Sequence, residues 1–140
     1  MKFELQNQFV SSSISFLNRL PLSGYQSIAR TRLIKILASK NEEIVEMQKK
    51  LIDQYAKKDE DGQLIVKDNN YQFTKENSKK FQEAYQKLML EDGEIEKATY
   101  SRHKEDCQDF LLNADINVSG DEATCYDALC IALDVDFDKR

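Results

Sequence analysis

The sequence has little of the material from which tight turns, disulfide frameworks and catalytic centres are usually made. Its 140 residues include one proline, four glycines, no tryptophan, one histidine and three cysteines. So few turn residues argue against a β-sandwich or barrel and favour helix. No apolar run approaches the roughly 18–20 residues of a membrane span, and acidic Glu4 lies where a signal peptide needs an apolar run. We therefore expect an intracellular protein that does not contact a membrane.

The motifs of the common catalytic classes are also missing. The chain contains no G-x-S-x-G, no G-x-x-x-x-G-K-[ST], no G-x-G-x-x-G and no H-E-x-x-H. One histidine leaves little capacity for acid–base catalysis near neutral pH, although paired carboxylates remain an alternative. We expect a protein that binds another macromolecule and is not an enzyme.

The apolar residues predict a mainly α fold with a minor β hairpin, in a single domain over residues 1–140. Its main feature is a segment free of proline and glycine from Tyr25 to Lys58. Apolar residues recur in it at spacings of three, four and seven, so we expect one amphipathic helix over most of 25–57 with these residues buried: Leu33, Leu37, Ile44, Met47, Leu51 and Tyr55.

Shorter elements are predicted to pack around this helix. They are a strand at Phe3–Leu5, a helix over 8–20 that Pro21 ends, a hairpin within 64–73, and helices over 75–91, 101–112 and 120–134. Thr74, Ser101 and the pair Ser119 with Glu122 are the expected helix caps. Residues 94–100 are compatible with either strand or helix.

Charge is distributed unevenly along the chain. Residues 105–140 contain ten acidic and two basic residues, a local net charge of −8, whereas the whole chain carries −5. Such a segment repels nucleic acid and suits a basic protein surface, although a merely solvated acidic face would have the same composition. We expect no direct nucleic-acid binding, and the predicted partner-binding residues are Asp109, Asp127, Asp134, Asp136 and Asp138.

The soft metal ligands of the chain are clustered. The only histidine and every cysteine lie between residues 103 and 130: His103, Cys107, Cys125 and Cys130. Three cysteines and one histidine form a common tetrahedral zinc set, and His103 and Cys107, four residues apart, lie on one helix face. The sequence therefore predicts a structural zinc site.

The second half of this predicted site has an alternative. Five residues turn a helix by roughly 140°, so Cys125 and Cys130 face apart on a regular helix. Asp121 lies four residues before Cys125 and is the alternative fourth ligand, with Cys130 in the core. In a third interpretation no metal binds, and the buried cysteines behave as small apolar side chains.

Three stretches give the chain a resemblance to a known group of proteins. ELQNQFVSSSISFLNRLPLSGYQSIARTRLIKIL (4–37), YAKKDEDG (55–62) and VSGDEATCYDALCIALDVDF (118–137) resemble small proteins of bacteriophages and prophages of Gram-positive bacteria. Together with its size and acidity, this makes the chain similar to phage-encoded anti-CRISPR proteins of type II-A systems.

The resemblance implies a function and a location. It implies stoichiometric inhibition of an RNA-guided DNA endonuclease, in the cytoplasm of the infected bacterial host. The zinc, if bound, would brace the acidic segment. The alternative function is a tail, packaging or assembly accessory of the virion, which would self-associate through the long helix.

Overall fold

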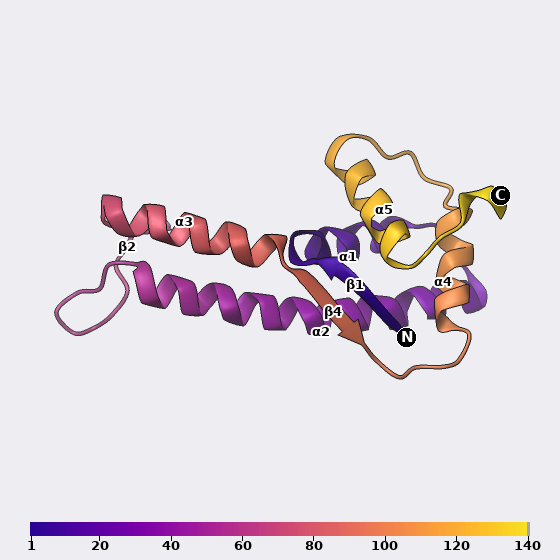
Figure 1. Cartoon of the computed structure of the whole chain (residues 1–140), viewed down its shortest axis with the longest axis horizontal. Coiled ribbons are helices and arrows are strands. Elements are labelled where there is room, and N and C mark those ends of the chain that lie inside the picture. Colours follow the sequence, from indigo (N-terminus) through magenta and orange to yellow (C-terminus); the bar gives the residue numbers. More distant parts are fainter. Residues whose placement is uncertain (140) are drawn as a thin grey trace. The chain divides into compact units, whose positions relative to one another are not determined.

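The computed structural model describes residues 1–139, and its helices and strands are labelled in Figure 1. The described residues form two compact units. Unit 1 consists of Met1–Asn41 with Asp92–Arg140, and unit 2 consists of Glu42–Glu91. The longest helix, α2 (Gly24–Tyr55), contributes its first part to unit 1 and its last part to unit 2.

A two-stranded antiparallel sheet links distant parts of the sequence in unit 1. Strand β1 (Lys2–Gln6) pairs with β4 (Asp92–Glu96), with Phe3 opposite Ile95 and Leu5 opposite Gly93. The apolar members of both strands are buried and the alternate residues are exposed, as a half-buried strand requires. Gly93 is needed for close packing, because a Cβ there would lie 3.1 Å from the carbonyl oxygen of Leu5.

Helix α1 (Val10–Arg19) follows β1 through the short 3₁₀ helix η1 (Asn7–Phe9). It ends where predicted, because Leu20 precedes Pro21 and takes an extended conformation with ψ 128°. After this break α2 begins at Gly24 and continues without interruption for 32 residues. The prediction of one long helix is therefore confirmed.

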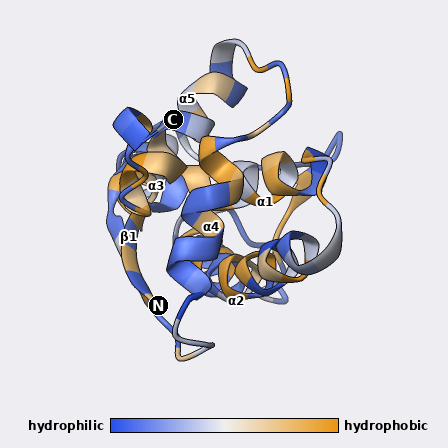
Figure 2. Cartoon of the chain, turned by 90° about the vertical axis from the view of Figure 1, so that its right-hand side faces the viewer, coloured by the Kyte–Doolittle hydropathy of each residue, from blue (hydrophilic) through white to orange (hydrophobic). Residues whose placement is uncertain are grey.

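The core of unit 1 lies between α1, the first part of α2, and the last two helices, α4 (His103–Leu112) and α5 (Gly120–Ala132). Figure 2 shows the apolar sides of α1, α2 and α4 turned toward one another. The largest fully buried side chains come from all four helices: Phe16, Leu17, Leu33, Leu37, Phe110, Leu111 and Leu129.

Unit 2 is a helical hairpin closed by a small β-hairpin. Strands β2 (Val66–Lys67) and β3 (Asn70–Tyr71) are joined by Asp68 and Asn69, which have φ 52° and 65°. Two consecutive left-handed residues form the tight turn whose twist matches paired strands. Helix α3 (Lys75–Leu90) follows and is capped by Thr74, whose hydroxyl accepts the amide hydrogen of Asn77 at 3.1 Å. The predicted hairpin and this cap are confirmed.

Of the two other predicted caps, Ser101 is wrong and Ser119 is confirmed in position only. Helix α4 begins after Arg102, not Ser101, and has no capping side chain. Ser119 does precede α5, but its side chain makes no cap hydrogen bond, and Glu122 pairs with Arg19 of α1 instead. A charged partner on a neighbouring helix replaces the local contact that the sequence pattern suggested.

The predicted fold class, mainly α with a minor β component, is confirmed. A single domain over residues 1–140 stays a prediction. In the part of the chain that the structure describes, no helix combines the length and the apolarity needed to cross a bilayer.

Candidate functional site

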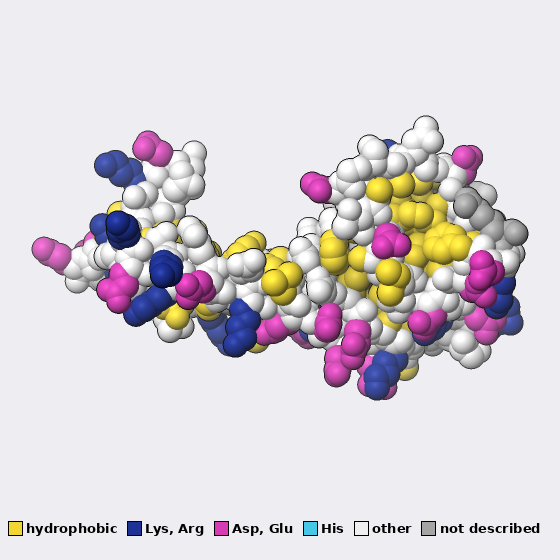
Figure 3. All heavy atoms as spheres, turned by 45° about the horizontal axis from the view of Figure 1, so that its top comes forward, with side chains coloured by type: hydrophobic (Ala, Val, Ile, Leu, Met, Phe, Trp, Pro, Cys, Tyr) yellow, Lys and Arg dark blue, Asp and Glu magenta, His cyan; other side chains and the backbone are white. Residues whose placement is uncertain are grey.

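The acidic segment forms an exposed surface on α4, α5 and the final 3₁₀ helix η2 (Phe137–Lys139). All five aspartates predicted to bind a partner are exposed: Asp109, Asp127, Asp134, Asp136 and Asp138. Figure 3 shows apolar side chains gathered on one face of unit 1, at the right of the view, with carboxylates around them. We call the exposed residues of α5 and of 134–138 the acidic face.

Two large apolar side chains belong to the acidic face. Ile131 of α5 is 68% exposed and lies one helical turn after Asp127. Phe137 is 43% exposed, and its ring meets that of Tyr126 edge-on at 6.4 Å. Apolar and aromatic residues within a charged rim are the usual composition of a protein-binding surface.

The backbone at the end of α5 holds the acidic face in position. Asp134 is left-handed, with φ 58°, its N–H donates to the Ile131 carbonyl at 3.1 Å, and the Val135 N–H donates to the Cys130 carbonyl at 2.9 Å. These are the two bonds of a Schellman motif, in which glycine usually takes the left-handed position. They end the helix and set the direction of residues 135–138.

Side chains from α4 support the same turn. Gln108 donates to the Leu133 carbonyl at 2.8 Å, and Lys104 pairs with the Asp134 carboxylate at 2.7 Å. Asp136 accepts the amide hydrogen of Asp138 at 3.0 Å and so shapes η2. Asp134 and Asp136 therefore have structural roles. Asp109, Asp127 and Asp138 are exposed.

His103 and Cys107 lie on one face of α4, as their spacing predicted, and both are fully buried. Nε2 of His103 lies 2.9 Å from the Ala29 carbonyl oxygen, and Nδ1 lies 2.8 Å from the Thr99 hydroxyl. A carbonyl only accepts, so Nε2 carries the hydrogen and Nδ1 accepts from Thr99. Burial lowers the pKa of His103, which favours this neutral form.

An aromatic ring covers the histidine. The Tyr100 ring stacks on His103 with centroids 4.8 Å apart, and the Arg32 guanidinium lies 5.1 Å from the centroid of Tyr100. The Tyr100 hydroxyl donates to Asp106 at 2.8 Å. This arrangement was not found from the sequence, because Ala29 and Arg32 are distant along the chain from the other residues.

The three cysteines are buried free thiols. Burial raises the pKa of both Cys107 and Cys130 to about 12, which stabilises the protonated form. Cys125 Sγ lies 3.4 Å from the hydroxyl of Ser13. These surroundings suit protonated thiols that pack in the core as small apolar side chains.

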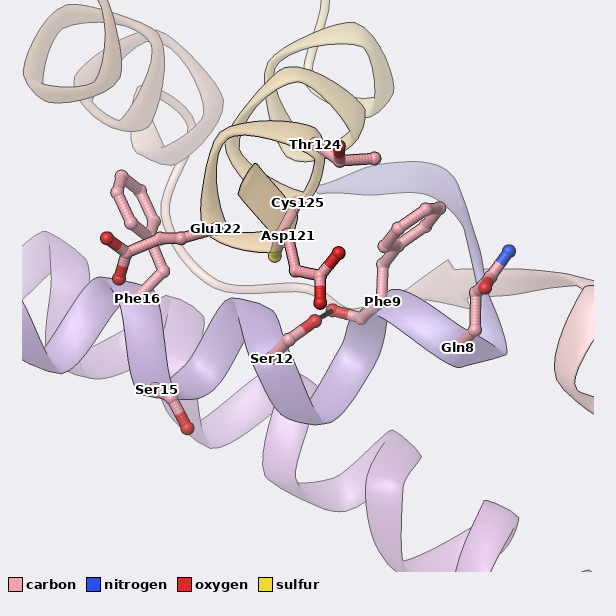
Figure 4. Close-up of a pocket in the computed structure, with 9 residues that line it drawn as sticks. All are labelled: Gln8, Phe9, Ser12, Ser15, Phe16, Asp121, Glu122, Thr124 and Cys125. Carbon is pink, nitrogen blue, oxygen red and sulfur yellow. Dashed lines mark hydrogen bonds between the residues drawn. The ribbon is translucent and has the colours of Figure 1, made fainter. Parts of the chain in front are cut away.

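Asp121, the alternative ligand, lines a groove of about 760 Å³ between α1 and α5. Figure 4 shows its carboxylate directed toward the first turn of α1, near Ser12 and Phe9, with Cys125 beside it. Over residues 1–139, no three His, Cys, Asp or Glu side chains come together as a metal-binding group. The arrangement does not fit a zinc ion, and zinc binding stays a prediction for elemental analysis.

The chain was compared with known proteins at three levels. Neither the protein-family models, nor the curated proteins, nor the solved structures included a match.

Proposed function

We propose that this protein is a non-enzymatic, stoichiometric inhibitor that binds a basic protein surface through the acidic face. The proposed target is the RNA-guided DNA endonuclease of type II-A CRISPR systems, so the protein would act in the cytoplasm of the infected bacterial host. The observation that carries the proposal is the exposure of Ile131, at 68%, within a rim of aspartates.

This composition suits binding because its apolar and its charged residues favour association in two different ways. Burying Ile131 and the exposed part of Phe137 favours association by removing apolar surface from water. The aspartates provide long-range attraction, which increases the association rate and selects a basic partner. The supported backbone of residues 134–138 keeps these groups in place before binding and so limits the ordering cost.

An RNA-guided nuclease offers surfaces of the required charge. It holds its guide–target heteroduplex and the displaced strand in positively charged channels. Carboxylates placed there would compete with phosphates for the same lysine and arginine side chains. Inhibition would then require one bound protein per nuclease and no chemical step.

The test is a DNA cleavage assay with the guide-loaded nuclease at fixed concentration and increasing amounts of this protein. We expect cleavage to fall in proportion to added protein, with no further loss on longer preincubation after binding is complete. Raising the salt concentration should slow association, because the Debye length is about 8–10 Å at physiological ionic strength. Unchanged cleavage at several-fold excess would contradict the proposed target.

The acidic face is tested with a charge reversal that leaves the Schellman turn intact. Asp127→Lys with Asp138→Lys should weaken inhibition at least tenfold, and adding Ile131→Ser should weaken it further. The matched control is Glu60→Lys with Asp61→Lys. Both residues are exposed in unit 2, and the two substitutions change the net charge by the same amount as those in the acidic face. Equal loss in both double variants would mean that only net charge matters.

A second function, a tail, packaging or assembly accessory of the virion, is favoured by a different observation. Unit 2 exposes Met47, Val66, Tyr71, Tyr85 and Leu90, which suits self-association. Rings or fibres of the purified protein, together with intact nuclease cleavage, would favour this alternative.

A further inference from the structure

Unit 2 buries few apolar side chains for its size. Within residues 42–91, all of which the structure describes, the buried apolar residues are Ile44 and Ala56. Helix α3 has 16 residues, and none of them is buried. A two-helix hairpin of this size does not by itself form a closed core, so its apolar surface favours a further packing partner.

The uncovered residues belong to regular stripes. On α3, Phe81, Ala84, Tyr85, Leu88 and Met89 follow the spacing of one helix face, and Tyr85 is 38% exposed. The other four are only half-buried.

The stripe on α2 is similarly incomplete. Met47, Leu51 and Tyr55 lie four residues apart; Met47 is 48% exposed and the other two are half-buried. Gln48 lies 3.5 Å from the sulfur of Met89, so the two helices do contact each other. Each apolar stripe is thus partly covered by the other helix. Its remaining side, the flank of the stripe, is exposed to solvent.

We propose that a second copy of this chain covers these flanks, so that two helical hairpins form a four-helix bundle. The choice of a second copy rests on charge. Residues 42–55 carry four acidic residues and two lysines, whereas α3 carries four lysines and two glutamates. A two-fold axis that places α2 of one copy beside α3 of the other brings opposite net charges together twice.

Two ion pairs within these helices do not oppose this association. Lys49 with Glu46, and Lys80 with Glu76, are pairs within single helices whose side chains are 55–79% exposed. Exposed pairs of this kind contribute little to stability and rearrange readily. Bundles of four helices commonly have a closed apolar core with charged residues outside, which is the pattern of α3 and the last part of α2.

This inference goes beyond the proposed function and is independent of it, because the acidic face belongs to unit 1. The test uses the full chain in sedimentation equilibrium and in size-exclusion chromatography with light scattering, from about 1 to 100 μM. The expected result is a dimer that dissociates on dilution. A mass of one chain throughout this range would overturn the proposal, as would a higher oligomer that does not pass through a dimer.

The interface is tested with Met47→Lys combined with Tyr85→Lys. Both side chains are already substantially exposed, so the monomer should keep its helical circular dichroism while the dimer is lost. The matched control is Ile28→Lys in unit 1, which is 45% exposed and should leave the dimer intact.

Hydrogen exchange supplies a readout that does not depend on a variant. Amides of α3 should exchange at least tenfold more slowly in the dimer than in the dilute monomer, whereas those of α5 should not change. Dimerisation that survives Met47→Lys with Tyr85→Lys, or concentration-dependent protection confined to α5, would place the interface elsewhere and overturn the proposal. Inhibition of the nuclease by the monomeric variant would leave the proposed function standing.

Discussion

Nε2 of His103 donates a hydrogen bond to the carbonyl oxygen of Ala29, 2.9 Å away and 74 positions earlier in the sequence. The bond joins α4 to α2 within unit 1. The Thr99 hydroxyl donates a hydrogen bond to the other ring nitrogen, Nδ1, at 2.8 Å. The only histidine of the chain thus has both nitrogens engaged in the interior. Packing and these two hydrogen bonds are sufficient to explain its position.

The first prediction concerns pH. Burial lowers the pKa of folded His103 below 6.5, so below pH 6.5 the unfolded chain binds more protons at this site than the folded chain does. The free energy of unfolding should therefore decrease as pH falls from 7.5 to 5.5. Urea unfolding at these two pH values measures the change. His103→Gln, which cannot titrate, should reduce the difference, and an equal decrease in both proteins would assign it to other groups.

The second prediction separates the two parts of α2. Leu37 is fully buried in unit 1, and Leu37→Asp should cost about 4 kcal/mol or more and unfold much of the protein. Leu51 is only half-buried in unit 2, so Leu51→Asp should cost about 1–2 kcal/mol in the dilute monomer. Thermal melting followed by circular dichroism compares them. Equal losses would mean that unit 2 is covered more completely than its exposure indicates.

The third prediction concerns the turn after α5. Asp134 has φ 58°, which a glycine adopts without strain, so Asp134→Gly should raise the free energy of unfolding by about 0.5–1 kcal/mol. Loss of the exposed Lys104 pair offsets part of this gain. Asp134→Val loses the same pair but adds a β-branched side chain, and should be destabilising. Denaturant unfolding of the three proteins tests the order, with the glycine variant most stable and the valine variant least stable. A glycine variant less stable than the parent protein would show that the ion pair dominates.

The fourth prediction decides the zinc hypothesis. If His103 and the cysteines bind zinc, elemental analysis of untagged protein should give about one zinc per chain, and a chelator should lower the melting temperature. Cys107→Ser should then lose the metal. Metal-free protein whose melting temperature does not change in chelator would contradict the zinc hypothesis. His103 and the three cysteines would then be explained as core residues by their burial and hydrogen bonds.

Much of the secondary structure was predictable because it depends on residues close in sequence. The absence of proline and glycine after Tyr25 predicts the long helix, Pro21 predicts the end of α1, and Thr74 caps α3 as expected. The pairing of β1 with β4 was not predicted, because residues 94–100 are too short a segment to distinguish strand from helix without the partner strand.

The candidate site was predictable only in part. The exposed aspartates were identified from charge alone, since isolated carboxylates stay in water. Their unequal roles were not, because the left-handed Asp134 and its support from Gln108 depend on how α4 meets α5.

Composition and short-range periodicity are enough to predict where most helices run, which residues are acidic and that the soft ligands cluster between residues 103 and 130. The hydrogen bond of His103 to Ala29, the ion pair of Glu122 with Arg19 and the exposure of Met47 could be seen only in the folded chain. Periodicity specifies which face of a helix is apolar. Which element covers that face, and how far along its length, depends on contacts between segments distant in sequence.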